Sequence, residues 1–442
     1  MKTKPLAETI YAEKLISDNI KQFPENFMWG ASTASHQVEG GNHNQWSVWE
    51  KQNAKRLASD AVHDLRLLPN YDALRVQLQD PNNYLSGAGV EHYSRYEADF
   101  DLLGQLNMNA FRFSIEWSRL EPTEGLWNEA EVEHYRRYIT ALKSRNIEPV
   151  LTLWHWTLPV WFADKGGFER SDNIHYFERY VRKVAEEFGA ELRYVVTLNE
   201  PNVYTSFGYG TGTWPPARKR PLLAVRVYRN LIKSHIAAYD ILKLTNPELQ
   251  IGPAAQLSDS RPVQPRNPLN RIVIALQMRI WNWWFLNAVR NKLDFIGVNY
   301  YFTEYRDWMG RIKNPPGPRS DLGWYMEPSG IQDLLQSVWR RYHKPLLIIE
   351  NGLADADDKQ RQWWLEQTLS ALNKAMLGGV PVIGYLHWSL LDNFEWAYGW
   401  WPKFGLIAVD RHTMKRTIRP SAHWLAKRIQ SERSSAAALK ID

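Results

Sequence analysis

Short runs of apolar, β-forming residues alternate with longer segments of helical periodicity along nearly the whole chain of 442 residues. A short apolar run that is bounded by turn residues is typical of a strand buried on both faces. Such runs predict strands at 27–31, 110–114, 149–154, 194–200, 249–254, 295–300, 346–350 and 382–388. Helical periodicity separates many of them, at 93–106, 129–145, 174–188, 222–244 and 361–377. Strand followed by helix, repeated eight times, predicts an α/β fold built as a single (β/α)8 TIM barrel.

A doubly wound open sheet would also alternate strands and helices, but no glycine-rich phosphate loop follows the first strand. Two stretches, 53–89 and 307–330, are longer than a minimal barrel needs. We expect them to be extended βα loops that build the rim of a pocket. Since no repeat or linker divides the chain, the expected parts are a polar N-terminal arm at 1–22, one barrel at 23–430 and a C-terminal tail at 431–442.

The composition excludes several classes of protein. The chain has no cysteine, which excludes disulfides, cysteine-based zinc sites and thiol catalysis. His43 and His412 have no ligand-like neighbours in the sequence, so no metal is expected. The net charge is +6, but its basic residues are scattered, and the densest group, at 218–220, is too short for a nucleic-acid surface. No nucleic-acid partner is therefore expected.

The apolar residues indicate neither export nor membrane insertion. Residues 1–22 contain no apolar stretch suited to a signal peptide, and no run reaches the roughly 18 apolar residues of a membrane span. We therefore expect a cytoplasmic protein with no membrane partner. The 22 Trp and 21 Tyr can fill a core or line a cleft with flat rings. For Trp281, Trp283 and Trp284, helix packing is the expected role.

Two glutamates, Glu200 and Glu350, each close one of the predicted strands. Active sites of barrel enzymes form at the C-terminal ends of the strands, so these carboxyl groups are expected to share one pocket. Paired carboxylates from separate strand ends are the chemical minimum for cutting a glycosidic bond. The other strand ends carry Gln37, Glu39, Arg112, His155, Trp156, Asn199, Asn299, Tyr300, Tyr301, Trp388, Glu395 and Trp396.

Four segments resemble the motifs of glycoside hydrolase family 1, the β-glucosidase and β-galactosidase family. Residues 197–201 resemble its acid/base motif, 349–352 its nucleophile motif, 27–40 its N-terminal signature and 388–396 its late sugar-binding segment. The resemblance extends from about residue 23 to 424. Two positions depart from the common pattern: Ile349 stands where Thr is usual, and His36 where an aromatic residue such as Tyr is usual.

The resemblance implies a role for each residue. Glu350 would be the nucleophile and Glu200 the general acid/base, while Arg112 and Tyr301 would flank Glu350 and favour its ionised form. The resemblance implies that the substrate is bound by Gln37, His155, Trp156, Asn199, Asn299, Tyr301, Trp324, Trp388, Glu395 and Trp396. Among these, Asn199 would hold the sugar 2-hydroxyl, and Trp324 would lie on the aglycone side.

The implied activity is that of a retaining, exo-acting β-glucosidase that also accepts β-galactosides and β-fucosides. Its expected substrates are small β-glucosides and short β-linked oligosaccharides, and no cofactor is expected. Two alternatives stay open. The same carboxylate pair would serve a transglycosylase, and a non-catalytic glycan-binding relative would share the fold.

Overall fold

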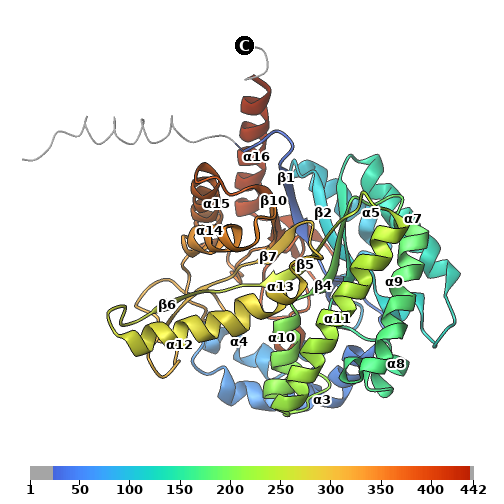
Figure 1. Cartoon of the computed structure of the whole chain (residues 1–442), viewed down its shortest axis with the longest axis horizontal. Coiled ribbons are helices and arrows are strands. Elements are labelled where there is room, and N and C mark those ends of the chain that lie inside the picture. Colours follow the sequence, from blue (N-terminus) through green and yellow to red (C-terminus); the bar gives the residue numbers. More distant parts are fainter. Residues whose placement is uncertain (1–22, 439–442) are drawn as a thin grey trace, which may run out of the picture.

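Eight parallel strands close into a barrel in the order β1-β10-β9-β7-β5-β4-β3-β2 (Figure 1). This computed structural model describes residues 23–438, with side chains to residue 434, so the expected arm at 1–22 lies outside the described residues. The barrel strands are Met28–Ser32 (β1), Ala110–Ser114 (β2), Glu148–Trp154 (β3), Tyr194–Asn199 (β4), Gln250–Gln256 (β5), Ile296–Asn299 (β7), Leu346–Glu350 (β9) and Val382–Trp388 (β10). The predicted (β/α)8 barrel is confirmed, and every strand lies within two residues of its predicted bounds.

Helices connect successive strands and cover the outside of the barrel (Figure 1). The α-helices are Ser35–Val38 (α2), Gln45–Asp64 (α3), Tyr71–Leu78 (α4), His92–Gln105 (α5), Trp117–Leu120 (α6), Glu129–Ser144 (α7), Val160–Asp164 (α8), Ile174–Phe188 (α9), Pro201–Thr205 (α10), Pro221–Thr245 (α11), Pro268–Met278 (α12), Trp284–Val289 (α13), Gly330–Tyr342 (α14), Arg361–Leu377 (α15) and Pro420–Ala438 (α16). Shorter 3₁₀ or π turns are Pro81–Tyr84 (η1), Gly167–Glu169 (η2), Ser171–Asn173 (η3), Ser206–Thr211 (η4), Arg279–Trp283 (η5) and Trp396–Tyr398 (η6). The five helices predicted by periodicity are confirmed to within one residue at each end.

Two small sheets lie outside the barrel. Asp259–Pro262 (β6) pairs in parallel with Thr303–Arg306 (β8), and Ile407–Val409 (β11) pairs antiparallel with Arg416–Ile418 (β12). The β6–β8 pair extends the loops that follow β5 and β7. It therefore widens one side of the barrel mouth.

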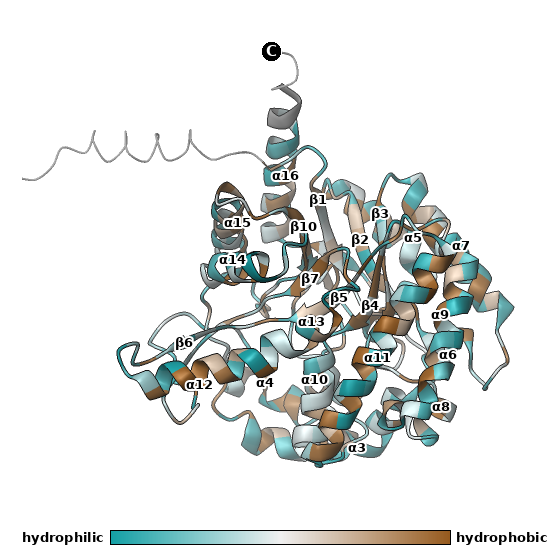
Figure 2. Cartoon of the chain, viewed as in Figure 1, coloured by the Kyte–Doolittle hydropathy of each residue, from teal (hydrophilic) through white to brown (hydrophobic). Residues whose placement is uncertain are grey.

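The sequence pattern explains how the barrel packs. Neighbouring residues of β4 belong to different buried clusters: Val196 packs with Ala110 and Val150, while Val195 belongs to the core shared with the helices. α9 supplies the matching apolar side, because its buried residues recur every three or four positions along the helix. Figure 2 shows the resulting concentration of apolar residues on the central strands.

Two expectations about boundaries change. The stretch 53–89 is largely helical, since it contains the second half of α3, all of α4 and η1. α3 begins at a capping box in which the Asn44 side chain accepts from the backbone of Ser47, and Ser47 Oγ accepts from the backbone of Asn44. The expected tail at 431–442 does not begin as a separate segment, because α16 continues through residue 431.

Candidate active site

A cavity of about 950 Å³ opens at the C-terminal ends of the barrel strands. Nine of the thirteen predicted site residues line it: His155, Trp156, Glu200, Tyr301, Trp324, Glu350, Trp388, Glu395 and Trp396. The other four, Gln37, Arg112, Asn199 and Asn299, are buried beside it and bond to the residues that line it. The structure therefore brings the whole predicted set together.

Glu350 lies at the end of β9 between two donors. Arg112, which is fully buried on β2, donates from Nη1 to Glu350 Oε1, and the Tyr301 hydroxyl donates to Oε2 over 2.8 Å. The same guanidinium donates to Asn199 Oδ1 at 2.7 Å and to Thr152 Oγ1 at 2.9 Å. Charge-assisted bonds of this kind stabilise the negative charge of the Glu350 carboxylate and fix its orientation.

Glu200 follows β4 and has a different environment. Its carboxylate accepts one bond, at 2.7 Å, from the neutral side chain of Asn299. Burial, and then the negative charge of Glu350, raise the pKa of Glu200 well above its ordinary value of 4.5. Glu200 also has a φ of +41°, a strained backbone conformation of the kind that clusters at functional sites. The structure thus pairs an ion-paired carboxylate with a carboxyl group that retains its proton.

Polar atoms without partners gather next to these two carboxyl groups. Gln37 Oε1, His155 Nδ1 and Asn299 Oδ1 are buried and have no hydrogen-bond partner within residues 23–434. Asn199 Nδ2 lies 3.0 Å from His155 Nε2, and burial followed by the charge of Arg112 lowers the pKa of His155 well below 6.5. The imidazole is therefore neutral, accepts from Asn199 at Nε2 and offers an N–H at Nδ1. Such orphaned groups are suited to the hydroxyls of a sugar.

Glu395 closes the same end of the cavity. Gln37 Nε2 donates to Glu395 Oε2 at 3.4 Å and to the carbonyl of Phe394 at 2.7 Å. Burial, and then the charge of Glu350, raise the pKa of Glu395 to about 8. Glu395 is therefore largely protonated at neutral pH, and it can both donate and accept a hydrogen bond there.

Aromatic rings form the wall of the cavity. His155 stacks between Trp388 and Trp396, with ring centroids 5.9 Å apart in both pairs. Trp156 packs against Trp396 at 4.9 Å. His36, at the position that departs from the family pattern, stacks on Trp396 and bonds to Glu50 at 2.7 Å. His36 thus supports the wall from behind.

The long βα loops form the outer rim, as predicted. From α3 the cavity is lined by Asn53, Arg56, Leu57, Asp60, Ala61 and Asp64. Trp324, in the stretch 307–330, packs against Tyr301 and Phe404 with ring centroids 5.8 and 6.1 Å apart. Both predicted loops therefore contribute side chains where the part of a substrate beyond its terminal sugar would lie.

Some predictions about single residues need correction. Glu39 does not face the cavity, because its carboxylate bonds to Arg119 and to the Tyr135 hydroxyl, at 2.8 and 2.9 Å. Trp281 was expected only to pack helices, but it lines the cavity and donates to Gln256 Oε1 at 2.5 Å. Trp283 and Trp284 do not line the cavity, which is consistent with their expected role in helix packing.

Several lining residues escaped the sequence analysis. Gln256 ends β5, so the strand-end rule would have reached it had the fifth strand been followed to its end. Phe207 and Trp214 lie in and after η4, where no motif marks them. Within residues 23–438 no cluster of His, Asp and Glu could hold a metal ion. In the same part of the chain, no helix has the length and apolarity to cross a bilayer.

Comparison with known proteins agrees with the fold and shows the family of the chain. The chain matches the model of glycosyl hydrolase family 1 over residues 19–291 and 285–434. β-Glucosidase A of Thermotoga maritima is 29% identical, over 93% of this chain and 99% of that protein. A galactolipid galactosyltransferase of Arabidopsis thaliana is 33% identical, over 77% of this chain and 58% of that protein.

The solved structure of a β-glycosidase from Pyrococcus horikoshii has the same architecture. It superposes with a TM-score of 0.82 at 34% identity, over 93% of this chain and 95% of that chain. A family match along nearly the full length, together with this barrel and its paired carboxyl groups, identifies the protein: it belongs to glycosyl hydrolase family 1 and is a β-glucosidase-like glycoside hydrolase.

Proposed function

We propose that this protein removes terminal β-glycosyl residues by double displacement, with Glu350 as nucleophile and Glu200 as general acid/base. The observation that carries the proposal is the contrast between the two buried carboxyl groups. Glu350 is held as an anion by Arg112 and Tyr301, whereas burial and the charge of Glu350 keep the proton on Glu200. A glycosidase needs one carboxyl group in each of these states at the same pH.

In the first step, Glu350 attacks the anomeric carbon while Glu200 gives its proton to the departing oxygen. The product is a glycosyl ester on Glu350, which no longer carries a negative charge. Because that charge contributes to the raised pKa of Glu200, ester formation makes Glu200 a stronger acid. Glu200 can then act as the base that activates water in the second step.

Asn199 is well placed to assist both steps. Its Oδ1 accepts from Arg112, and its Nδ2 is directed to His155, so its orientation is fixed from two sides. A rigid amide beside the nucleophile would bond the sugar 2-hydroxyl, a contact that strengthens as the anomeric carbon gains positive charge.

The groups at the closed end favour a neutral terminal sugar. Gln37, His155 and Glu395 supply donors and acceptors there, and no lysine of residues 23–434 lines the cavity. A 6-phosphate would have to enter beside the acidic groups of that end, whereas the arginines that line the cavity, Arg56 and Arg306, belong to its rim, so the juxtaposition is costly. The protein should therefore cleave p-nitrophenyl β-glucoside with a higher kcat/KM than its 6-phosphate, and the reverse order would contradict this specificity.

Gln37 and Glu395 can bond a 4-hydroxyl in either orientation, so we include β-galactosides and β-fucosides among the substrates. A panel of chromogenic β-glucoside, β-galactoside, β-fucoside and β-mannoside tests this range. Retention is tested by NMR of the first-formed sugar, which should be the β-anomer. An α-anomer would contradict the double displacement.

Transfer to an alcohol instead of water is the second candidate activity. The Arabidopsis relative is named a galactosyltransferase, and the same carboxyl pair would serve both reactions. Analysis of products at high substrate concentration separates the two, since transfer yields new glycosides whereas hydrolysis yields free sugar alone.

A further inference from the structure

α12 and the π turn η5 that continues it carry a stripe of large apolar side chains on their solvent side. Leu269, Ile272 and Leu276 of α12 and Ile280 of η5 follow one another at spacings of three or four residues, and they are 59%, 54%, 54% and 60% exposed. Residues at such spacings lie on one face of a helix. In Figure 2 apolar and polar turns alternate along this helix, which projects from the barrel.

A neighbouring hairpin extends the stripe. Residues 306–312 turn back on themselves through a bridge between Arg306 and Ile312, and the backbone of Arg306 accepts from Asn270 of α12 at 2.8 Å. Trp308, Met309 and Ile312 of this hairpin are 50%, 56% and 49% exposed. We call Leu269, Ile272, Leu276, Ile280, Trp308, Met309 and Ile312 the apolar face. Exposed apolar patches of this kind mark surfaces that bind a partner.

The unpaired charges of the segment around α12 are positive, while the two acids of the hairpin side, Glu304 and Asp307, are ion-paired with Arg306 and Arg311. The segment 261–293 contains six Lys or Arg and no Asp or Glu, although the whole chain has a net charge of only +6. Arg266, Arg271 and Arg279 are exposed, and none of them has an ion-pair partner among residues 23–434. A partner that covers this face must therefore offer apolar groups and negative charge together.

The apolar face borders the mouth of the active site. Gln277 and Trp281, which directly follow Leu276 and Ile280, line the cavity, as does Arg306 of the hairpin. A partner that binds the apolar face would therefore lie next to the side of the cavity that receives the aglycone.

In place of the expectation from the sequence that there is no membrane partner, we propose that the apolar face and its arginines bind the surface of an anionic lipid bilayer. Apolar side chains that enter the acyl boundary, flanked by arginines at the level of the headgroups, are the features of an interfacial helix. The 11 residues of α12 are too few to cross a bilayer, so the helix would lie along it. A symmetric dimer through this face is disfavoured, because it would bring together the unpaired arginines of two copies, and the nearby acids Glu304 and Asp307 already pair with Arg306 and Arg311.

This orientation has a consequence that rests on the proposed hydrolase function. With the mouth beside the bilayer, a glycoside with a lipid aglycone can extend its sugar into the cavity while its acyl chain stays in the membrane. The substrate class would then include lipid-linked β-glycosides as well as soluble ones.

The test measures binding of the full chain to vesicles of phosphatidylcholine and phosphatidylglycerol in equal parts, by co-sedimentation. The test variant is the pair Ile272→Asp and Leu276→Asp. The control is the pair Leu244→Asp and Leu377→Asp, which replaces two exposed helical leucines where α11 and α15 end and changes the net charge equally. The wild type should bind mixed vesicles, less at high salt and less to pure phosphatidylcholine. The test pair should weaken binding at least about tenfold, and the control pair by less than about twofold.

Activity assays separate this proposal from the proposed function. Both pairs should hydrolyse soluble p-nitrophenyl β-glucoside like the wild type, whereas the test pair alone should lose hydrolysis of a long-chain alkyl β-glucoside held in the vesicles. A wild type that binds vesicles but hydrolyses no glucoside would contradict the proposed hydrolase activity and still support the bilayer-binding proposal. Three results would contradict the bilayer-binding proposal: no vesicle binding by the wild type, equal binding by the test pair, or a wild-type dimer that the test substitutions dissociate, without any vesicle binding.

Discussion

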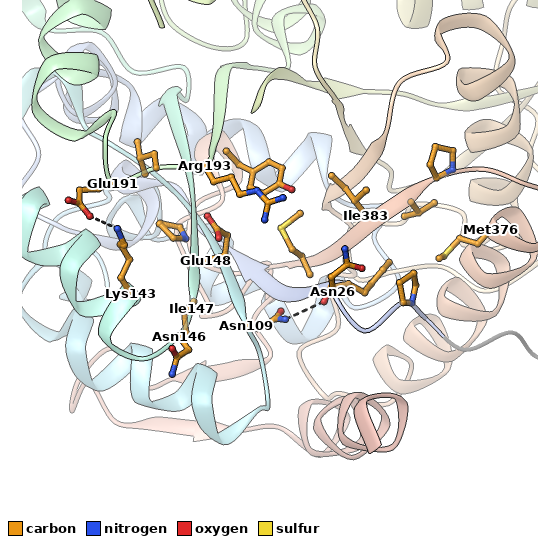
Figure 3. Close-up of a pocket in the computed structure, with 18 residues that line it drawn as sticks. Asn26, Asn109, Lys143, Asn146, Ile147, Glu148, Glu191, Arg193, Met376 and Ile383 are labelled. Atoms are coloured by element: carbon orange, nitrogen blue, oxygen red, sulfur yellow. Dashed lines mark hydrogen bonds and ion pairs between the residues drawn. The ribbon is translucent and has the colours of Figure 1, made fainter. Parts of the chain in front are cut away.

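The two ends of the barrel have cavities of similar size but different chemistry. The cavity at the C-terminal end has a volume of about 950 Å³, and the one at the N-terminal end about 870 Å³. Figure 3 shows the second, where the Lys143 ammonium pairs with Glu191, and Glu148 lies near Arg193. Burial raises the pKa of Glu148, but Arg193 and Lys143 act against this rise. Here the charges of the acids are partly compensated by nearby cations.

At the C-terminal end three acids interact with one another, and only one of them is ion-paired with Arg112. Glu200, Glu350 and Glu395 share one cavity, in which Arg112 is bonded to Glu350 alone among them. The pKa values of Glu200 and Glu395 are raised in part by the charge of Glu350. Volume therefore does not distinguish an active site from an ordinary cavity in this molecule, whereas the uncompensated interaction among buried acids does.

The largest effect expected from this contrast is at Glu350. Glu350→Gln keeps the shape of the side chain but removes the nucleophile, so kcat should fall at least about 10⁴-fold. Glu148→Gln makes the same change at the other end and should alter kcat/KM by less than about twofold. A 2-deoxy-2-fluoro glucoside should label Glu350 of the wild type. A label on another residue, or equal losses in the two variants, would contradict the assignment.

Glu200→Ala should have the next largest effect, and one that depends on the leaving group. The loss should reach about 10²–10⁴-fold for poor leaving groups, which need a proton, and should be much smaller for 2,4-dinitrophenolate. Azide should restore turnover by attacking the glycosyl ester, and the product should be a β-glycosyl azide. A uniform loss on all substrates, without rescue by azide, would exclude Glu200 as the acid/base.

The sequence predicts best those parts of the molecule whose signal is local. A buried strand and the residue that ends it lie in one short segment, so Glu200, Glu350 and His155 could be placed at the barrel mouth by the strand-end rule. The periodicity of α9 and α15 likewise fixes their bounds, because one apolar side of each must face the barrel.

The rest depends on contacts between distant segments. The bond from Trp281 to Gln256 and the packing of Trp214 on Trp156 arise only once η5, β5 and the segment after η4 are folded around the mouth. α12 itself is hard to predict, because its apolar residues face both inward and outward and give no single-sided pattern. The ion pair of Glu39 with Arg119 could not be predicted either, because no residue near Glu39 in the sequence indicates this distant partner.

The third prediction concerns pH and Glu395. Its pKa is about 8 in the folded protein, against an ordinary 4.5, so the folded state binds this proton more tightly. The contribution of this proton to the free energy of unfolding is therefore fully present below about pH 4.5. It is lost as the pH rises through about 8, and the total loss is at most about 5 kcal/mol. Glu395→Gln should lose less stability than the wild type between pH 5 and pH 9, as measured by urea unfolding.

Glu148→Gln provides the control at the other end of the barrel. Arg193 and Lys143 offset part of the effect of burial on the pKa of Glu148, so Glu148→Gln should change the pH dependence of stability less than Glu395→Gln does. If the wild type and Glu395→Gln lost equal stability over this range, Glu395 would not titrate as a buried acid, and its contrast with Glu148 would disappear.

The smallest expected effect is at the rim. Trp324 lines the cavity and packs on Tyr301, so it can contact the aglycone without touching the terminal sugar. Trp324→Ala should lower kcat/KM for aryl glucosides by about 3–10-fold, in line with about 0.5–1.5 kcal/mol for one aromatic contact. The loss should shrink for methyl β-glucoside, whose aglycone is too small to reach the ring. Trp363→Ala, which alters a partly exposed tryptophan of α15 outside the cavity, should leave both substrates unchanged. An equal loss of kcat/KM on both substrates in Trp324→Ala would mean that Trp324 acts by holding Tyr301 against Glu350. Other residues would then have to contact the aglycone.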